Sequence, residues 1–281
     1  MKTSLTLALA GLLTLAGLAG AQQQAAPASA PASPVPDPDR RPSLAQPDYA
    51  IITMPTTLRL AAHKSAFRLT HRFGRSLSAG SFGSLVEDLF GFDSGAQIGL
   101  EYRYAPMHGA QIGFNRTSNR TIEFFGQYQL LRQDKGKPFT VDALVAVDGT
   151  NNFRDSYSPS VGAVLSRTFG THGALYVQPS WINNTNALPS ALVNQNSTTM
   201  LGIGGRLRVR KTVYLVAEVN PRLSGYHPGT HQGAFGIEKR AGGHVFQLNF
   251  SNGFGTMPSQ VARGGTGSKD WYIGFNLSRK F

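Results

Sequence analysis

The chain has 281 residues, of which only 15% are charged, and it carries a formal net charge of +12. A basic balance is typical of nucleic-acid-binding proteins, but a glycine-rich chain with an export signal has little opportunity for that role, so we exclude nucleic acid as a partner. The sequence has no cysteine, which excludes a disulfide framework and a lipid-modified cysteine anchor.

Two N-terminal segments are expected to precede the folded domain. Residues 1–21, MKTSLTLALAGLLTLAGLAGA, combine a basic start, an apolar stretch and a small-x-small ending, which predicts a secretory signal peptide. Residues 22–52 are rich in proline and alanine, and this composition predicts a disordered linker. The alternative role for the linker is binding of the cell wall or of a periplasmic partner. No later stretch has 18 consecutive apolar residues, so a helix that spans the inner membrane is excluded by length.

From residue 65 onward, apolar and polar residues alternate in short runs, which predicts β-strands with one apolar face. Most runs are close to the 9–11 residues that a tilted strand needs to cross a bilayer. The expected strands are 65–73, 95–104, 109–117, 120–132, 138–148, 159–169, 173–182, 198–209, 212–220, 232–239, 244–252 and 270–281.

The connections between these strands alternate in length. Short turns are expected at 170–172 and 210–211, whereas 149–158, 183–197 and 253–269 are long loops. An even strand number with short turns at one end and long loops at the other is typical of bacterial outer-membrane barrels. We therefore predict an all-β fold for residues 53–281: a closed antiparallel transmembrane β-barrel of about twelve strands with up-and-down topology. It would lie in the outer membrane of a diderm bacterium and contact outer-membrane lipid.

The last run, DWYIGFNLSRKF, is expected to close the barrel by pairing with the first strand, because a lipid-exposed edge leaves backbone groups unpaired at several kcal/mol each. Its aromatic end resembles the C-terminal signal by which barrel-assembly machinery recognises its clients. Arg279 departs from the apolar residue that is usual at the third position from the end. The residues of the expected signal are Tyr272, Gly274, Phe275, Leu277 and Phe281.

Four stretches together resemble a family of bacterial β-barrel proteins that is classed as a domain of unknown function. They are RLTHRFG at 68–74, LFGFDSGAQIGLEYRY at 89–104, QIGFNRTSNR at 111–120 and WYIGFNLSRKF at 271–281. The similarity covers about residues 54–281. It implies an outer-membrane barrel fold, and it supplies no activity and no catalytic residues.

The strand register places eleven charged residues on the lumen side, six of them basic and five acidic. Two interpretations stay open, because a barrel of eight strands is filled by its own side chains while one of sixteen encloses a channel. In one, the lumen is a narrow pore or passive channel for small solutes, with a preference for anions from Arg206 and Arg208 on one strand and Arg68 and Arg72 on the first. In the other, salt bridges plug the lumen of a structural or surface-interaction barrel. The expected lumen-lining residues are Arg68, Arg72, Glu101, Arg103, Glu123, Asp142, Arg206, Arg208, Glu218, Glu238 and Lys280.

The first long loop contains a distinctive segment at 82–95. Its residues Leu85, Val86, Leu89, Phe90 and Phe92 are too apolar for a freely solvated loop, so we expect it to be ordered. It would either fold into the barrel mouth as a constriction or pack on the rim. The candidates for a constriction are the acidic residues Glu87, Asp88 and Asp93.

Other motifs give weaker signals. His227 and His231 lie in one turn-rich loop, but two histidines without a patterned carboxylate are poor evidence for a metal site, and we expect no metal and no cofactor. The glycines of LGIGGRLRVR at 201–210 are not followed by a helix, and in a strand they relieve curvature or make room in the lumen. A lipid hydrolase is a minor alternative, yet the register places His71 outward and Ser251 inward, so we expect no enzyme.

The closing strand generates a first prediction. We expect that Phe281→Glu, or a charged tail added after Phe281, impairs membrane insertion far more than deletion of residues 25–45, because the strand closes the barrel. The measurement is the amount of each variant in the outer-membrane fraction. Equal amounts of the two variants would contradict the assigned role of the strand.

Overall fold

The computed structural model describes residue 39 and residues 43–188 and 192–281, and the structural statements below refer to these residues. The expected signal peptide and most of the expected linker lie outside them. Among the described residues, no helix is long and apolar enough to cross a membrane.

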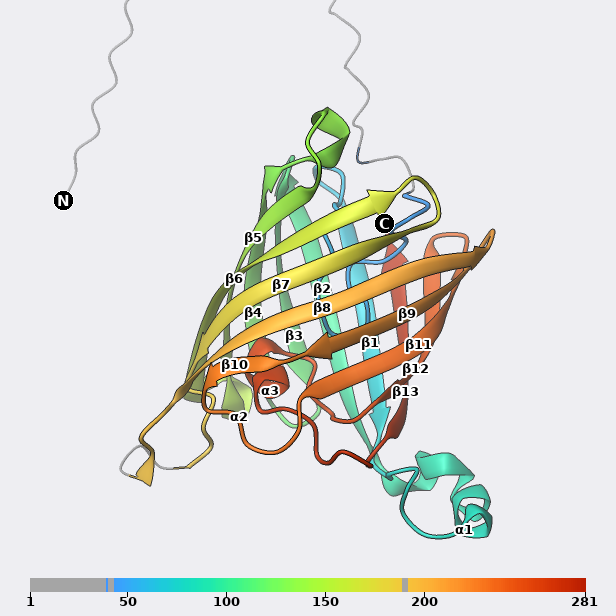
Figure 1. Ribbon diagram of the computed structural model, residues 1–281, viewed down its shortest axis with the longest axis vertical. Coiled ribbons are helices and arrows are strands. Elements are labelled where there is room, and N and C mark those ends of the chain that lie inside the picture. Colours follow the sequence, from blue (N-terminus) through green and yellow to red (C-terminus); the bar gives the residue numbers. More distant parts are fainter. Residues whose placement is uncertain (1–38, 40–42, 189–191) are drawn as a thin grey trace, which may run out of the picture. The chain divides into compact units, whose positions relative to one another are not determined.

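Thirteen strands form one antiparallel sheet (Figure 1). Twelve are long, and the short β10 adds to the end of β8. The strands are β1 (Ser65–Phe73), β2 (Ala96–Met107), β3 (Ala110–Thr117), β4 (Ile122–Leu131), β5 (Thr140–Gly149), β6 (Asp155–Phe169), β7 (Gly173–Asn183), β8 (Ser197–Arg210), β9 (Val213–Asn220), β10 (Arg222–Gly225), β11 (Gln232–Ala241), β12 (His244–Ser251) and β13 (Tyr272–Lys280). The short helices are α1 (Phe82–Glu87), η2 (Leu89–Ser94), η3 (Gln133–Lys135), α2 (Thr150–Phe153) and α3 (Pro258–Ala262).

The sheet closes on itself, which confirms the predicted barrel. Its order is β10-β8-β7-β6-β5-β4-β3-β2-β1-β13-β12-β11-β9, and an additional pairing of β8 with β9 completes the ring. Twelve long strands therefore surround the lumen, and β10 is the one departure from the simple up-and-down pattern.

The last strand pairs with the first, as expected. The register of β1 and β13 runs from Ala66 opposite Lys280 to Arg72 opposite Gly274. The Phe281 N–H continues the contact and donates to the Ser65 carbonyl oxygen at 2.9 Å. Arg279, which breaks the apolar pattern, faces outward, and its guanidinium lies 5.0 Å from the centre of the Phe281 ring. The cation thus covers the terminal aromatic without entering the lumen.

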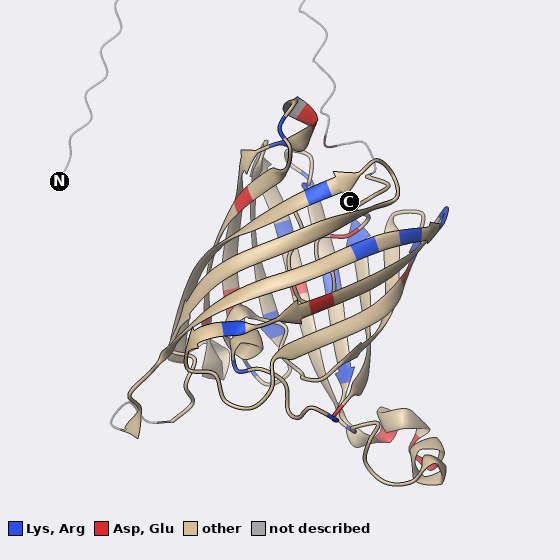
Figure 2. Ribbon diagram, viewed as in Figure 1, with Lys and Arg blue, Asp and Glu red and all other residues tan. Residues whose placement is uncertain are grey.

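The two ends of the barrel differ. One end, called the short-turn end, carries the turns 108–109, 170–172, 211–212 and 242–243, and the C-terminus lies there (Figure 1). The opposite, long-loop end carries α1, η2, α2, α3 and the loop after β7. The outer wall exposes a belt of large apolar side chains, among them Leu100, Phe114, Phe124, Val145 and Leu175. Figure 2 shows long uncharged stretches along the strands, as a lipid-facing wall requires.

The lumen is occupied by the chain itself. Residues 43–62, called the lumen segment, lie inside the barrel, and Ile51 and Ile52 are fully buried. The Ile51 N–H donates to the Met54 carbonyl oxygen and the Thr56 N–H to that of Tyr49, both at 2.8 Å, so the segment turns back on itself. This differs from the expectation that residues up to 52 form a linker. The proline-rich composition does not extend to residues 49–54, and Ile51, Ile52 and Met54 pack in an apolar cluster with wall residues such as Val164 and Val216.

Candidate channel lumen

Strand alternation points most of the predicted lumen-lining residues into the barrel. Those that are buried are Arg68, Arg72, Arg103, Glu123, Asp142, Arg206, Glu218 and Glu238. Glu101 and Lys280 are half-buried, and the Lys280 ammonium lies 4.9 Å from the centre of the Tyr49 ring of the lumen segment. Arg208 does not join this interior set, because its guanidinium donates to the Lys211 carbonyl oxygen in a short turn.

Glu218 of β9 holds the tip of the lumen segment. Its carboxylate accepts hydrogen bonds from the N–H groups of Ile52 at 3.0 Å, Thr53 at 2.9 Å and Met54 at 3.1 Å. The Thr53 hydroxyl donates to the same carboxylate. Successive backbone N–H groups in a turn form a concave site for an anion, and here the anion is a side chain of the barrel wall.

Other wall side chains satisfy the carbonyl groups of the segment. Arg206 donates to the Ala50 carbonyl oxygen at 2.8 Å, and Gln247 donates to that of Ile51 at 2.5 Å. The Ile52 carbonyl oxygen accepts from the guanidinium of Arg68 and from the amide of Asn276. Gln127 and Gln111 donate to the carbonyl oxygens of Thr56 and Leu58 at 2.8 and 3.1 Å. Wall side chains thus take the place of a neighbouring strand.

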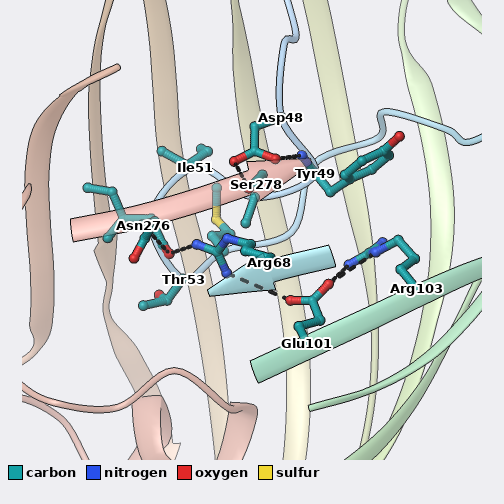
Figure 3. Close-up of polar contacts among 12 residues, drawn as sticks. Asp48, Tyr49, Ile51, Thr53, Arg68, Glu101, Arg103, Asn276 and Ser278 are labelled. Atoms are coloured by element: carbon teal, nitrogen blue, oxygen red, sulfur yellow. Dashed lines mark hydrogen bonds and ion pairs between the residues drawn. The ribbon is translucent and has the colours of Figure 1, made fainter. Parts of the chain in front are cut away.

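Charged wall residues also pair with each other. Arg206 forms a bidentate pair with Glu238, with distances of 2.7 and 2.8 Å, and both side chains are fully buried. Arg103 lies 3.0 Å and Arg68 3.8 Å from the Glu101 carboxylate (Figure 3). The expected anion preference relied on Arg206 and Arg208 together with Arg68 and Arg72. Arg206 pairs with Glu238, Arg68 lies near Glu101 and Arg208 binds a carbonyl oxygen at the rim, so three of these four are not free charges in the lumen.

Two glycines of β8 make room for the segment. A Cβ atom on Gly204 would lie 2.5 Å from Cδ1 of Ile51 and 2.7 Å from Cε of Met54. A Cβ atom on Gly202 would lie 2.7 Å from Sδ of Met54. The glycine run of the LGIGGRLRVR motif therefore makes room inside the lumen, which was one of the two expected roles.

Helix α3 fills the lumen from the long-loop end. Val261 and Ala262 of α3 pack against Ile182 and Met200 of the wall in one buried cluster. The Ser259 hydroxyl donates to the buried carboxylate of Asp148. A five-residue helix in a glycine-rich loop is too short to show an apolar period, so it could not be predicted from the residue pattern.

A small chamber remains between the lumen segment and α3. Its volume is about 100 Å³, enough for several water molecules. Its lining includes Met54 of the segment, Met257 beside α3, and a polar wall of Arg68, Asn115, Glu123 and Ser180. Buried atoms of this wall, Arg68 Nε, Asn115 Oδ1 and Ser180 Oγ, have no hydrogen-bond partner among the described residues. The chamber is therefore suited to water or to a small polar solute.

The loop with α1 and η2 does not form a constriction. It extends past the ends of β1 and β13, away from the lumen (Figure 1). Glu87 and Asp93 are exposed, while Asp88 pairs with Arg75 at 2.9 Å. The hydrogen bond from Arg75 holds the pKa of the Asp88 carboxyl below its usual value. The loop is ordered, as expected, but the three acidic residues lie outside the barrel mouth.

The weaker motifs stay apart from one another. His71 faces outward and stacks on Phe275 with ring centres 4.7 Å apart, whereas Ser251 is buried in the lumen, so the two do not form a catalytic pair. His231 accepts from the Arg222 N–H, and the described part of the chain contains no group of three or more His, Cys, Asp or Glu placed to hold a metal ion.

Comparisons with known proteins agree with the barrel. The family model "Membrane bound beta barrel domain (DUF5777)" matches residues 48–281, a range that includes most of the lumen segment. The NanC porin is 8% identical, with 77% of this chain and 98% of that chain covered and a TM-score of 0.50. An outer membrane channel from Pseudomonas putida F1 is 11% identical, with 79% and 97% covered and a TM-score of 0.49. At 8% identity, the likeness to the NanC porin shows the fold alone. No curated protein matches the chain.

The Glu218 contacts generate a second prediction. We expect Glu218→Gln to weaken docking of the lumen segment by about 3 kcal/mol, the size of one or two charge-assisted hydrogen bonds. The chain has no cysteine, so a single cysteine at Ala50 reports docking by its reaction with a water-soluble maleimide. Labelling should accelerate with Glu218→Gln but stay slow with Asp148→Asn, because that carboxylate contacts α3. Equal rates in both variants would show that Glu218 does not hold the segment.

The glycine contacts generate a third prediction. We expect Gly204→Val to displace the lumen segment, because the new side chain would occupy the space of Ile51 and Met54. The matched control is Gly233→Val in β11, where a Cβ atom would meet only a carbonyl oxygen at 3.8 Å. Faster labelling of the cysteine at Ala50 is expected for the first variant alone. Slow labelling of Gly204→Val would mean that the lumen accommodates the larger residue.

Proposed function

Because the chain belongs to the DUF5777 family of membrane-bound β-barrel domains, which places it in the outer membrane, we propose that it is a narrow passive channel for small polar solutes. In the state that the structure describes, its own lumen segment closes it. Opening would require the segment to withdraw from the lumen.

The observation that carries this proposal is the polar contact between segment and wall. A lumen that served only as a permanent core would be filled at lower cost by apolar side chains, because buried charges and amides need partners. Here the wall has Glu218, Arg206, Gln247 and Gln127, which bind the segment's backbone. The same groups can bind water when the segment leaves. These polar groups of the wall therefore suit both a closed and a hydrated state.

The path of the segment also supports withdrawal. The part of the segment that follows its tip contacts Gln111, and the part that precedes the tip contacts Ser278 and Tyr214. All three of these wall residues lie toward the short-turn end. The one backbone bridge within it joins Ala50 and Pro55 of the segment itself. Departure of the segment tip would consequently leave every strand pairing of the barrel intact.

A second candidate function is a structural barrel with a permanently plugged lumen. The observation in its favour is that the lumen is filled from both ends, by the segment and by α3. For either function we propose that the chain is no enzyme, which the separation of His71 and Ser251 supports.

We also propose that the barrel-assembly machinery recognises the last strand. Phe275 and Phe281 are exposed on the outer wall, and Leu277 lies between them on the same face. Tyr272 and Gly274, the other two residues of the expected signal, point inward. The part of the signal that a partner can contact is therefore its apolar outer row.

Conductance of planar lipid bilayers tests the channel, and this is the fourth prediction. We expect the full-length protein to be mostly closed and a variant without residues 43–61 to open far more often. Replacing residues 255–266 by a short Gly-Ser linker in that variant, which removes α3, should raise the conductance further. Circular dichroism and heat-dependent gel migration confirm that each variant keeps the barrel. If the altered barrels conduct but the full-length protein never opens, the plugged candidate is correct.

A further inference from the structure

The loop with α1 and η2 exposes large apolar side chains at the long-loop end. We call the set Phe82, Val86, Leu89, Phe90 and Phe92 the apolar tip. Phe82 is 74% exposed, Phe92 61% and Leu89 58%, which is unusual for residues of an ordered segment. Neither the channel nor its closure uses these residues.

The tip is built to keep this shape. Ser81 caps α1 by accepting a hydrogen bond from the Ser84 N–H, and Leu85 is buried beneath the helix. Arg75 donates to the Ser84 carbonyl oxygen, to Asp88 and to the Ala79 carbonyl oxygen. The apolar side chains are thus held outward by a network of polar contacts on the inner side of the loop.

The backbone of the tip adopts an unfavourable conformation. Leu89 has a φ of 44° and Phe90 a φ of 58°, in the left-handed region that bulky residues rarely occupy. Such strain persists only where the surrounding structure fixes it, and it often marks a functional segment. The strain here keeps Leu89 and Phe90 at the surface.

Aromatic rings join the tip to the lipid-facing wall. The Phe92 ring stacks on Phe73 of β1 with centres 4.3 Å apart, and Phe73 lies 6.2 Å from Phe275 of β13. His71 stacks on Phe275 in turn. The apolar tip is therefore a continuation of the surface that already contacts lipid.

From this continuity we propose that the apolar tip inserts into the boundary between headgroups and acyl chains of the outer leaflet and anchors the long-loop end of the barrel. The apolar face of an interfacial helix is buried roughly 5–10 Å into the boundary between headgroups and acyl chains. The loop projects past the strand ends (Figure 1). Its aromatic contact with β1 makes it continuous with the lipid-facing wall, and this continuity favours lipid over a protein partner. This role is independent of whether the lumen opens.

Fluorescence quenching tests the anchor, as the fifth prediction. Single cysteines at Leu89 and Phe92 are labelled with the environment-sensitive dye NBD, and the matched control is a cysteine at His227, an exposed residue of another loop at the same end. The labelled proteins are reconstituted into phosphatidylcholine vesicles with acyl chains brominated near the glycerol end. We expect the two tip labels to lose most of their emission to the brominated lipid and little to aqueous iodide, and the control to show the reverse.

Two results would overturn the proposal. Equal iodide quenching at all three positions would show that the tip is solvated. The second result is emission from the tip labels that is shifted to the blue, is insensitive to brominated lipid and changes with the protein-to-lipid ratio. This result would show that the tip contacts a second copy of the chain. Because the substituted positions are exposed, the barrel should fold in every variant, and circular dichroism verifies this.

Discussion

No backbone N–H or carbonyl group can remain without a partner in hydrocarbon, and this constraint determines the whole structure. The outer wall meets it by closing the sheet through the β8–β9 and β1–β13 pairings. The closed ring of twelve long strands leaves an interior that its own side chains do not fill. The lumen segment enters that interior without a strand partner, so its backbone groups depend on side chains of the wall, above all on Glu218.

The same constraint explains which parts of the fold could be predicted. Alternation along runs such as 271–281 reports the two faces of a strand directly, and the unequal loops report the two ends of the barrel. Strand number, closure and the inward direction of residues such as Arg68 and Glu238 follow from these local patterns. Among the strands of the described residues, only β10 was not predicted, because four residues are too few to show a period.

The contents of the lumen were harder to predict, because they depend on contacts between residues far apart in the chain. The apolar stretch from Tyr49 to Met54 was one available signal, but it directly follows the proline-rich residues, and its first part was included in the predicted linker. Charge counting showed that the lumen is nearly neutral. It did not show that Glu238 neutralises Arg206 or that the Arg208 guanidinium binds a carbonyl oxygen of the adjacent turn. Likewise, the composition of the α1 loop predicted order, while its direction depends on the Arg75 contacts.

The lumen segment precedes the barrel in the sequence, yet two of its partners come from the last strand. Asn276 and Ser278 of β13 bind residues 224 and 230 positions earlier in the chain. Contacts over such separations form late, because the intervening loop must be closed first. The segment can therefore make these two contacts only once β13 is in place. During biogenesis the wall that β13 supplies must exist before the seal is complete, so a newly made molecule stays incompletely sealed until residues 43–62 have made these contacts.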